Sequence, residues 1–405
     1  MIDVAEAIRR LDEAFEPLAS ESVELGASLG RSLAESVVTD RPFPASDRSA
    51  MDGFAMRSVD LQNEETLRLV GEVRAGGDPS EVEIGQGECC RIFTGAVIPR
   101  GADTVVMVEK SAPVESELEG QERVRFLDRP EAGQHIRSQA QDRAAGETIL
   151  HPGDRIDARV IAALASVGKA TLSVIRRPRV CVLSTGDELV AVDQTPHAYQ
   201  IRDSNGPMVS AQFAALGFEV QRLHAVEDRR EALREAIQQG LSAELLVLTG
   251  GVSVGDYDFV ADELERAGVE TLFHGVAMKP GKPLYAGRHA RGAVFGLPGN
   301  PLSAYVGTQL FALPVARRLA GTRQIWPRWR RATLTQPLRR RAGRETYHLV
   351  VCAETAGGCE VRPVVSQGSG DVLSLADANA LMRSSKEVTE LAAGAQVEIT
   401  ELAER

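Results

Sequence analysis

Three glycine-bearing segments each follow a short apolar run and precede a helix-like stretch. They run from Leu183 to Glu188, from Leu248 to Asp258 and from Leu297 to Ser303. If the apolar runs are parallel strands, all three loops emerge at one edge of a sheet. Glycine lets backbone N–H groups approach an anion closely, and a helix amino terminus adds partial positive charge. One such loop is ordinary in an α/β protein, whereas three together predict an edge that binds phosphates or other oxyanions.

Two of these loops also carry carboxylates, which a site for phosphate alone would avoid. Asp187 and Glu188 lie in the first loop, and Asp256 and Asp258 in the second. A Mg²⁺ ion resolves the conflict, because proteins hold it with one or two carboxylates together with substrate phosphates. The alternative is that these acids cap helices. Capping is the better interpretation for Asp256, and Asp228 is ambiguous in the same way.

Lysine is used sparingly in this chain, with five lysines against 41 arginines. Two of the five, Lys279 and Lys282, bracket a Pro-Gly pair. Lysine is a compact point charge that suits a tetrahedral oxyanion, whereas arginine favours planar bidentate partners. The segment is therefore a candidate oxyanion loop, and the alternative is an exposed turn, which Pro-Gly pairs also mark.

Other polar segments give weaker signals. Residues 46–55 and 91–96 combine Ser, Asp, Thr and Gly, which are ordinary turn formers. Seven arginines between Arg328 and Arg344 could suggest RNA binding, but aromatic residues make up only 4% of the chain and offer little stacking surface. We expect these arginines to form a solvated face.

Charge and composition narrow the classes of protein. The 405 residues carry a net charge of -11, which is the wrong sign for a nucleic-acid-binding protein. Five scattered cysteines fit neither a disulfide framework nor a metal site and favour a cytoplasmic location. The acidic start resembles no signal peptide, and no apolar run is long enough for a membrane span.

The chemistry-bearing loops need a sheet that holds them. Nearly continuous apolar runs at 180–183, 245–248 and 293–295 predict strands buried on both faces. Helical periods intervene at about 207–216, 229–239, 257–267 and 302–319. This alternation is typical of an α/β fold, a doubly wound and mostly parallel sheet.

The flanking segments predict further domains. Ile8, Leu11, Phe15 and Leu18 recur at helical spacing, and an Ala- and Leu-rich helix is expected at 157–167. Short alternating runs predict a β-rich inserted domain and a small barrel-like β domain at the carboxyl end. The predicted domains are an α/β domain at 1–20 plus 177–326, a linking domain at 21–40 plus 143–176, a β-rich insert at 41–142 and a β domain at 327–405.

The motifs together resemble the molybdopterin molybdenumtransferase family, which is related to the E domain of gephyrin. The resemblance rests on seven segments in order, which are 49–55, 92–96, 183–189, 203–205, 250–255, 279–283 and 297–301. Residues 367–370 and 378–379 extend it into the last domain.

The resemblance implies an elongated homodimer that converts adenylylated molybdopterin and molybdate, with Mg²⁺, into molybdenum cofactor and AMP. It also points to the molybdopterin adenylyltransferase as a partner enzyme. The family's catalytic positions fall on Asp52, Thr94, Asp142, Glu188, Asp228, Asp258 and Lys279. Substrate-binding positions fall on Ser184, Thr185, Gly186, Asp187, Gly250, Gly251, Ser253, Lys282, Pro298, Gly299 and Asn300. Glu188 and Asp258 are the expected Mg²⁺ ligands, and no covalent nucleophile is expected.

Two alternatives stay open at this point. A molybdopterin adenylyltransferase would share the α/β loops but would leave residues 41–150 and 327–405 without a purpose. A non-catalytic scaffold related to gephyrin would tolerate loss of Glu188 or Asp258, and both are present. The chain departs from the family pattern at Gly275 and Leu349, where a basic residue is common, and at Ala140 and Ala380, where glycine is usual. A single missing basic side chain would weaken oxyanion capture by about 1 kcal/mol.

Overall fold

The computed structural model describes residues 1–114, 121–226, 229–252 and 259–402. The chain divides into two compact units. The larger unit comprises Met1–Glu35, Pro152–Ile161 and Thr171–Arg405, and the smaller unit comprises Ser36–His151 and Ala162–Ala170. Helix α2 (Ala158–Ser166) was expected at 157–167. Its first residues belong to the larger unit and its last residues to the smaller unit. The four domain boundaries expected from the sequence stay a prediction.

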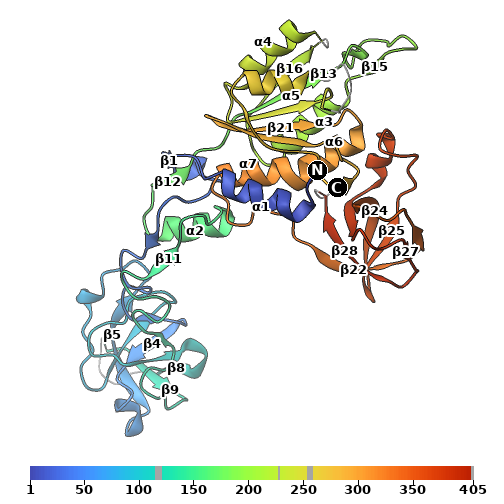
Figure 1. The fold of residues 1–405 in the computed structure, drawn as a ribbon. Helices are drawn as coiled ribbons and strands as arrows, with labels where there is room; N and C mark the ends of the chain where they lie inside the picture. Colours follow the sequence, from blue (N-terminus) through green and yellow to red (C-terminus); the bar gives the residue numbers. More distant parts are fainter. Residues whose placement is uncertain (115–120, 227–228, 253–258, 403–405) are drawn as a thin grey trace. The chain divides into compact units, whose positions relative to one another are not determined.

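A six-stranded sheet forms the centre of the larger unit (Figure 1). Its strands, in spatial order, are β16 (Val220–Val226), β13 (Val180–Thr185), β17 (Leu245–Thr249), β21 (Gly292–Leu297), β20 (Tyr285–His289) and β18 (Glu270–His274). The first four strands are parallel, and the last two run antiparallel to their neighbours. The mostly parallel α/β fold is therefore confirmed.

Helices cover both faces of this sheet. The helices are α1 (Val4–Ala14), α3 (Asn205–Ala214), α4 (Arg230–Gly240), α5 (Val260–Arg266), α6 (Pro301–Gly307) and α7 (Leu313–Leu319). Val180 and Val182 of β13 pack in one apolar core with α1, α3, α6 and α7. Cys181 and Leu183 pack with α4 and α5 on the opposite face. Because successive strand residues face opposite sides, burial on both faces accounts for the unbroken apolar runs.

The helix expected at 302–319 contains an irregular turn. A π-helical segment at Thr308–Ala312 separates α6 from α7. Pro314 lies at the start of α7 and has no backbone N–H to donate to the preceding turn. The widened turn accommodates the missing hydrogen bond, which the apolar periodicity could not indicate.

The carboxyl-terminal strands close into a small barrel. The sheet contains β19 (Met278–Lys279), β24 (Glu345–Thr355), β25 (Gly358–Pro363), β22 (Arg330–Leu334), β28 (Gln396–Glu401) and β26 (Ala380–Ser384). Strand β24 pairs with both β25 and β26, which completes the ring. Strand β19 comes from the central part of the chain and pairs in parallel with β24. The barrel-like β domain is confirmed.

The smaller unit is β-rich, as expected. Its six-stranded sheet contains β7 (Thr104–Met107), β4 (Gly53–Met56), β6 (Glu88–Ile92), β5 (Thr66–Val73), β9 (Arg123–Phe126) and β8 (Ser111–Val114). Phe54, Met56 and Leu67 pack in a core on one face, and Ala55, Val73 and Ile92 pack in a second core.

The other described strands form short two-stranded ladders. They pair β1 (Ser20–Glu24) with β12 (Thr171–Ile175), β2 (Val37–Val38) with β11 (Thr148–Leu150), β3 (Arg48–Ser49) with β10 (Ile136–Arg137), β14 (Leu189–Val190) with β15 (Ile201–Arg202), and β23 (Leu338–Arg339) with β27 (Glu390–Leu391). Among the described residues, no helix is both long and apolar enough to cross a membrane.

Candidate functional site

The three predicted glycine loops meet at the carboxyl edge of the central sheet. Strands β13, β17 and β21 are adjacent and parallel, so their following loops emerge together. The Gly250 N–H donates to the Leu297 carbonyl at 3.0 Å. A Cβ added to Gly250 would lie 2.4 Å from the Thr185 carbonyl oxygen, and one added to Gly299 would lie 3.7 Å from the Gly250 Cα. Only glycine at position 250 allows the first two loops to approach this closely.

Buried polar atoms without a partner lie at the same edge. The Thr185 hydroxyl and the Asn205 side-chain carbonyl oxygen Oδ1 are both buried. Neither atom has a hydrogen-bond partner among the described residues. Asn205 begins α3, and its Nδ2 donates to the Gly299 carbonyl at 2.7 Å. The Ser184 hydroxyl is also buried, but it accepts a hydrogen bond from Thr249 at 3.3 Å. Because buried polar groups are normally paired, two unpaired ones at one edge indicate that a polar ligand completes the site.

The predicted Mg²⁺ ligand Glu188 lies in the first loop and is exposed. A Cβ added to Gly186 would come 2.7 Å from a Glu188 carboxylate oxygen, so this carboxylate folds back over the Gly186 backbone. Asp187 beside it is also exposed. A carboxylate and the unpaired Thr185 hydroxyl are hard oxygen donors of the kind that Mg²⁺ prefers. These residues therefore fit a Mg²⁺ ion that is shared with substrate phosphates.

Three predicted site residues fall outside the described part of the chain. They are Asp228, Ser253 and Asp258. Their roles, including that of Asp258 as a Mg²⁺ ligand, stay predictions. Gly251 follows Gly250 with a positive φ of 60° and lies against Thr185 and Val260.

The predicted lysine loop lines a cavity of about 510 Å³, here called the cationic pocket. Lys279 and Lys282 line it together with Pro298 and Asn300 of the third glycine loop. Its other basic residues are Arg339, Arg340, Arg341, Arg344 and His348, and no Asp or Glu lines it among the described residues. A cavity with this lining attracts oxyanions, as the two lysines predicted.

Two arginines of the cationic pocket correct part of one expectation. Arg340 and Arg344 were expected on a solvated face, yet they are partly buried in the lining of this cavity. Arg339 and Arg341 also line it but are exposed, as expected, and Arg339 pairs with Glu390 at 3.0 Å. Strand pairing explains the difference, because Met278 pairs with Glu345 and Lys279 with Thr346, which brings the arginine-rich segment to the lysine loop. The Arg340 Nε is buried and has no partner among the described residues.

His348, which lines the cationic pocket, should make the free energy of unfolding depend on pH. Burial, with Arg340 and Lys279 nearby, lowers the pKa of His348 to about 4. In the unfolded chain this pKa is about 6.5, so between these values the unfolded chain binds a proton that the folded protein does not. We expect the free energy of unfolding to fall by up to about 3 kcal/mol as the pH drops from 6.5 to 4.

Urea unfolding of His348→Gln across this pH range checks that prediction. The variant should lose this part of the pH dependence, while His197→Gln, at an exposed histidine, should keep it. Parallel curves for the wild type and His348→Gln would contradict the assignment.

The smaller unit brings two of its predicted residues together. The Asp52 carboxylate accepts hydrogen bonds from the Thr94 N–H and hydroxyl, both at 2.7 Å. These bonds lower the pKa of Asp52. Asp142 instead forms an ion pair with Arg137 at 2.5 Å. The unit thus presents two exposed carboxylates in hydrogen-bonded positions on the loops that the sequence singled out.

Three contributors to this site were not among the predicted site residues, although Asn205 lies in the 203–205 segment of the family resemblance. Asn205 closes the edge between α3 and Gly299, while Arg340 and His348 line the cationic pocket. An asparagine at the start of a predicted helix was a signal for the first. The other two depend on pairing between segments more than 60 residues apart, which leaves no local pattern.

Family comparisons cover nearly the whole chain. Residues 2–168 match the family described as "MoeA N-terminal region (domain I and II)". Residues 181–318 match "Probable molybdopterin binding domain", and residues 331–402 match "MoeA C-terminal region (domain IV)".

Individual relatives agree with these matches. The chain is 33% identical to a molybdopterin molybdenumtransferase of Staphylococcus epidermidis over 387 residues, which cover 94% of this chain and 91% of the relative. It is 32% identical to one from Staphylococcus aureus with the same coverage. A crystal structure of a molybdopterin biosynthesis MoeA protein from Pyrococcus horikoshii superposes with a TM-score of 0.83 at 27% identity and covers 99% of both chains.

Proposed function

Since the chain belongs to the molybdopterin molybdenumtransferase family, we propose that it inserts molybdate into adenylylated molybdopterin and releases AMP with the help of Mg²⁺. The observation that carries this proposal is the shared third glycine loop. Gly299 lies against Gly250 at the carboxyl edge, while Pro298 and Asn300 line the cationic pocket. A phosphate-binding edge and an oxyanion pocket are therefore neighbours, as a reaction between an adenylylated substrate and molybdate requires.

The residues of the carboxyl edge would bind the pyrophosphate part of the substrate. Backbone N–H groups of the glycine loops favour negative charge. The unpaired Thr185 hydroxyl and Asn205 amide oxygen would pair with the ligand. Glu188, and Asp258 by resemblance, would hold Mg²⁺, which would neutralise charge on the phosphates.

The cationic pocket would hold the molybdate. Lys279 and Lys282 supply compact charges, and the arginines around them add to the positive potential. In this scheme positioning and charge neutralisation supply the catalysis, and no side chain attacks the substrate.

We also propose a homodimer in the cytoplasm, with the molybdopterin adenylyltransferase as a partner enzyme.

The comparisons favour this reaction over the two alternatives. An adenylyltransferase would use the α/β part alone, whereas the matched relatives share the whole chain, including the β-rich insert and the barrel. Incubation with adenylylated molybdopterin, Mg²⁺ and molybdate should release AMP, which chromatography detects. Formation of the adenylylated product from ATP and molybdopterin would favour the adenylyltransferase, and the absence of both activities would favour the scaffold.

Lys282→Ala tests the oxyanion role of the cationic pocket. Loss of one charge-assisted contact should raise the molybdate concentration for half-maximal AMP release by about tenfold. Lys110→Ala is the matched control, because Lys110 lies in the smaller unit and is half exposed. Equal molybdate dependence in Lys282→Ala and the wild type would contradict the assignment.

A further inference from the structure

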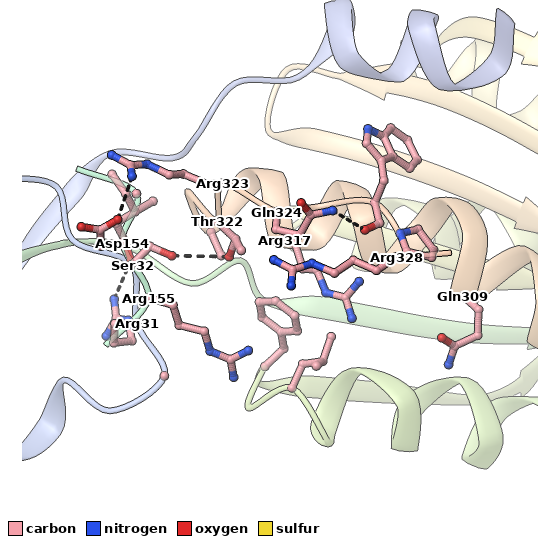
Figure 2. Close-up of a pocket in the computed structure, with 18 of the residues that line it drawn as sticks. Arg31, Ser32, Asp154, Arg155, Gln309, Arg317, Thr322, Arg323, Gln324 and Arg328 are labelled. Carbon is pink, nitrogen blue, oxygen red and sulfur yellow. Dashed lines mark hydrogen bonds and ion pairs between the residues drawn. The ribbon is translucent and has the colours of Figure 1, made fainter. Parts of the chain in front are cut away.

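A second cavity in the larger unit lies away from the glycine loops. It has a volume of about 880 Å³ and is lined by segments that precede the central strands. Arg177 comes just before β13, Phe218 just before β16, and Arg317 lies in α7 near its end. These positions are at the amino edge of the parallel strands, the opposite end from the glycine loops. Figure 2 shows this cavity, which we call the arginine pocket.

Seven arginines line the arginine pocket, and their ion pairs neutralise only some of them. Arg323 pairs with Asp154 at 2.8 Å, and Arg330 pairs with Glu354 at 2.7 Å. Arg31 pairs with Glu21. The other four, Arg155, Arg177, Arg317 and Arg328, have no ion pair with any described carboxylate.

Two of the unpaired arginines donate to backbone carbonyls, which are neutral groups. Arg177 donates to the Leu29 carbonyl at 3.1 Å, and Arg317 donates to the Ile325 carbonyl at 3.2 Å. Figure 2 shows Arg155 and Arg317 extending into the same space from different segments. The Nε of Arg31, in the same lining, is buried and has no partner among the described residues. The two carboxylates in the lining, Asp154 and Glu401, are already paired with Arg323 and Arg330, so the other four arginines have no counter-charge in the cavity.

This arrangement is costly without a ligand. Burial, followed by Arg31 and Arg155, lowers the pKa of Arg177. Burial and Arg155 lower the pKa of Arg317 in the same way. Arg155 therefore repels both neighbours, and an anion between them would relieve the repulsion. Buried charges are normally paired, so the two partly buried arginines without a carboxylate, Arg177 and Arg317, indicate anion binding. Arg155 and Arg328 are exposed and add positive charge at the same cavity.

We propose that the arginine pocket binds an organic diphosphate, at a second site distinct from the carboxyl edge. Guanidinium groups pair with phosphate oxygens in a bidentate manner, and four of them are more than enough to neutralise an organic diphosphate. Phe218 and Trp326 line the same cavity and offer apolar surface to the organic part. The volume of about 880 Å³ is large enough for a molecule of nucleotide size.

The chain provides its own reporter for this site. Its two tryptophans, Trp326 and Trp329, both line the arginine pocket. We therefore expect a saturable change in tryptophan fluorescence when pyrophosphate or ADP is added to the full chain. The titration is run in EDTA, because binding at the acidic carboxyl edge is expected to need Mg²⁺ whereas binding to arginines does not. ADP should bind at least as tightly as pyrophosphate.

Two variants test whether the arginines hold the ligand. Arg155→Ala and Arg317→Gln should each weaken pyrophosphate binding by about tenfold or more. Arg159→Ala is the matched control, because Arg159 is 91% exposed and pairs with Asp157. Lys282→Ala should also leave this affinity unchanged, which separates the arginine pocket from the cationic pocket. Without ligand, Arg155→Ala should unfold at no lower temperature than the wild type, because it removes a repulsive charge.

Several results would contradict the proposal. It fails if neither pyrophosphate nor ADP changes the tryptophan fluorescence at millimolar concentration. It also fails if Arg155→Ala binds pyrophosphate as tightly as the wild type does. Weaker binding of ADP than of pyrophosphate would exclude an organic diphosphate as the occupant. A change of oligomeric state in Arg155→Ala, measured by light scattering, would show that carboxylates of a second copy fill the pocket, and would also overturn the proposal.

Discussion

Glu188→Gln should lower the rate of the proposed AMP release at least about 100-fold, because it removes the charge of the proposed Mg²⁺ ligand and leaves the loop geometry intact. The carboxylate is exposed, so its replacement should hardly change the free energy of unfolding. The Mg²⁺ concentration for half-maximal activity should rise in the same variant. Rates measured across a Mg²⁺ series, together with thermal unfolding, separate loss of metal binding from loss of folding.

Asp193→Asn is the control for this experiment. Asp193 is also exposed, lies five residues further along the chain and undergoes the same loss of charge. It should keep the wild-type rate and the wild-type Mg²⁺ dependence. If Glu188→Gln released AMP as fast as Asp193→Asn, Glu188 would not be a Mg²⁺ ligand.

Gly250→Ala should both destabilise the protein and abolish most activity. Gly250 has a φ of 94°, and an added Cβ would lie 2.4 Å from the Thr185 carbonyl oxygen and 3.0 Å from its hydroxyl. Backbone strain and the clash together should cost about 2–4 kcal/mol of unfolding free energy. Because the clash pushes against β13, it would also displace the Thr185 hydroxyl from the ligand.

Gly299→Ala provides a control for the stability measurement. A Cβ there would make only an ordinary contact of 3.7 Å with the Gly250 Cα, and Gly299 does not have a positive φ. Urea unfolding should therefore show a change below about 1 kcal/mol for Gly299→Ala. Similar losses of stability in both variants would mean that the close approach of Gly250 to Thr185 is not what requires glycine.

The central sheet was predictable because its strands carry a strong local signal. Burial on both faces requires unbroken apolar runs, as in Leu245–Thr249, and these runs predicted the strands and the edge where the glycine loops meet. The π-helical turn before Pro314 was not predictable from periodicity, since a single proline can end, kink or widen a helix.

The two basic cavities were harder to predict, for a different physical reason. Whether an arginine is solvated or faces a ligand depends on the segment that folds against it. Arg344 reaches the lysine loop only because β24 pairs with β19, and Arg155 approaches Arg317 from a segment about 160 residues away. The net charge of a sequence does not show which segments fold against one another. A chain with a net negative charge can therefore contain two positively charged cavities.

The pairing of β19 with the carboxyl-terminal barrel has a consequence for how this enzyme could diverge. Lys279 belongs to the central part of the chain, yet its backbone is aligned by hydrogen bonds with Glu345 and Thr346 of the barrel. The barrel is therefore not an interchangeable appendage. Replacement of the barrel by an unrelated domain, in nature or in a chimaera, would remove strand β24, with which the lysine loop pairs. Substitutions in the barrel and in the lysine loop are therefore expected to depend on one another.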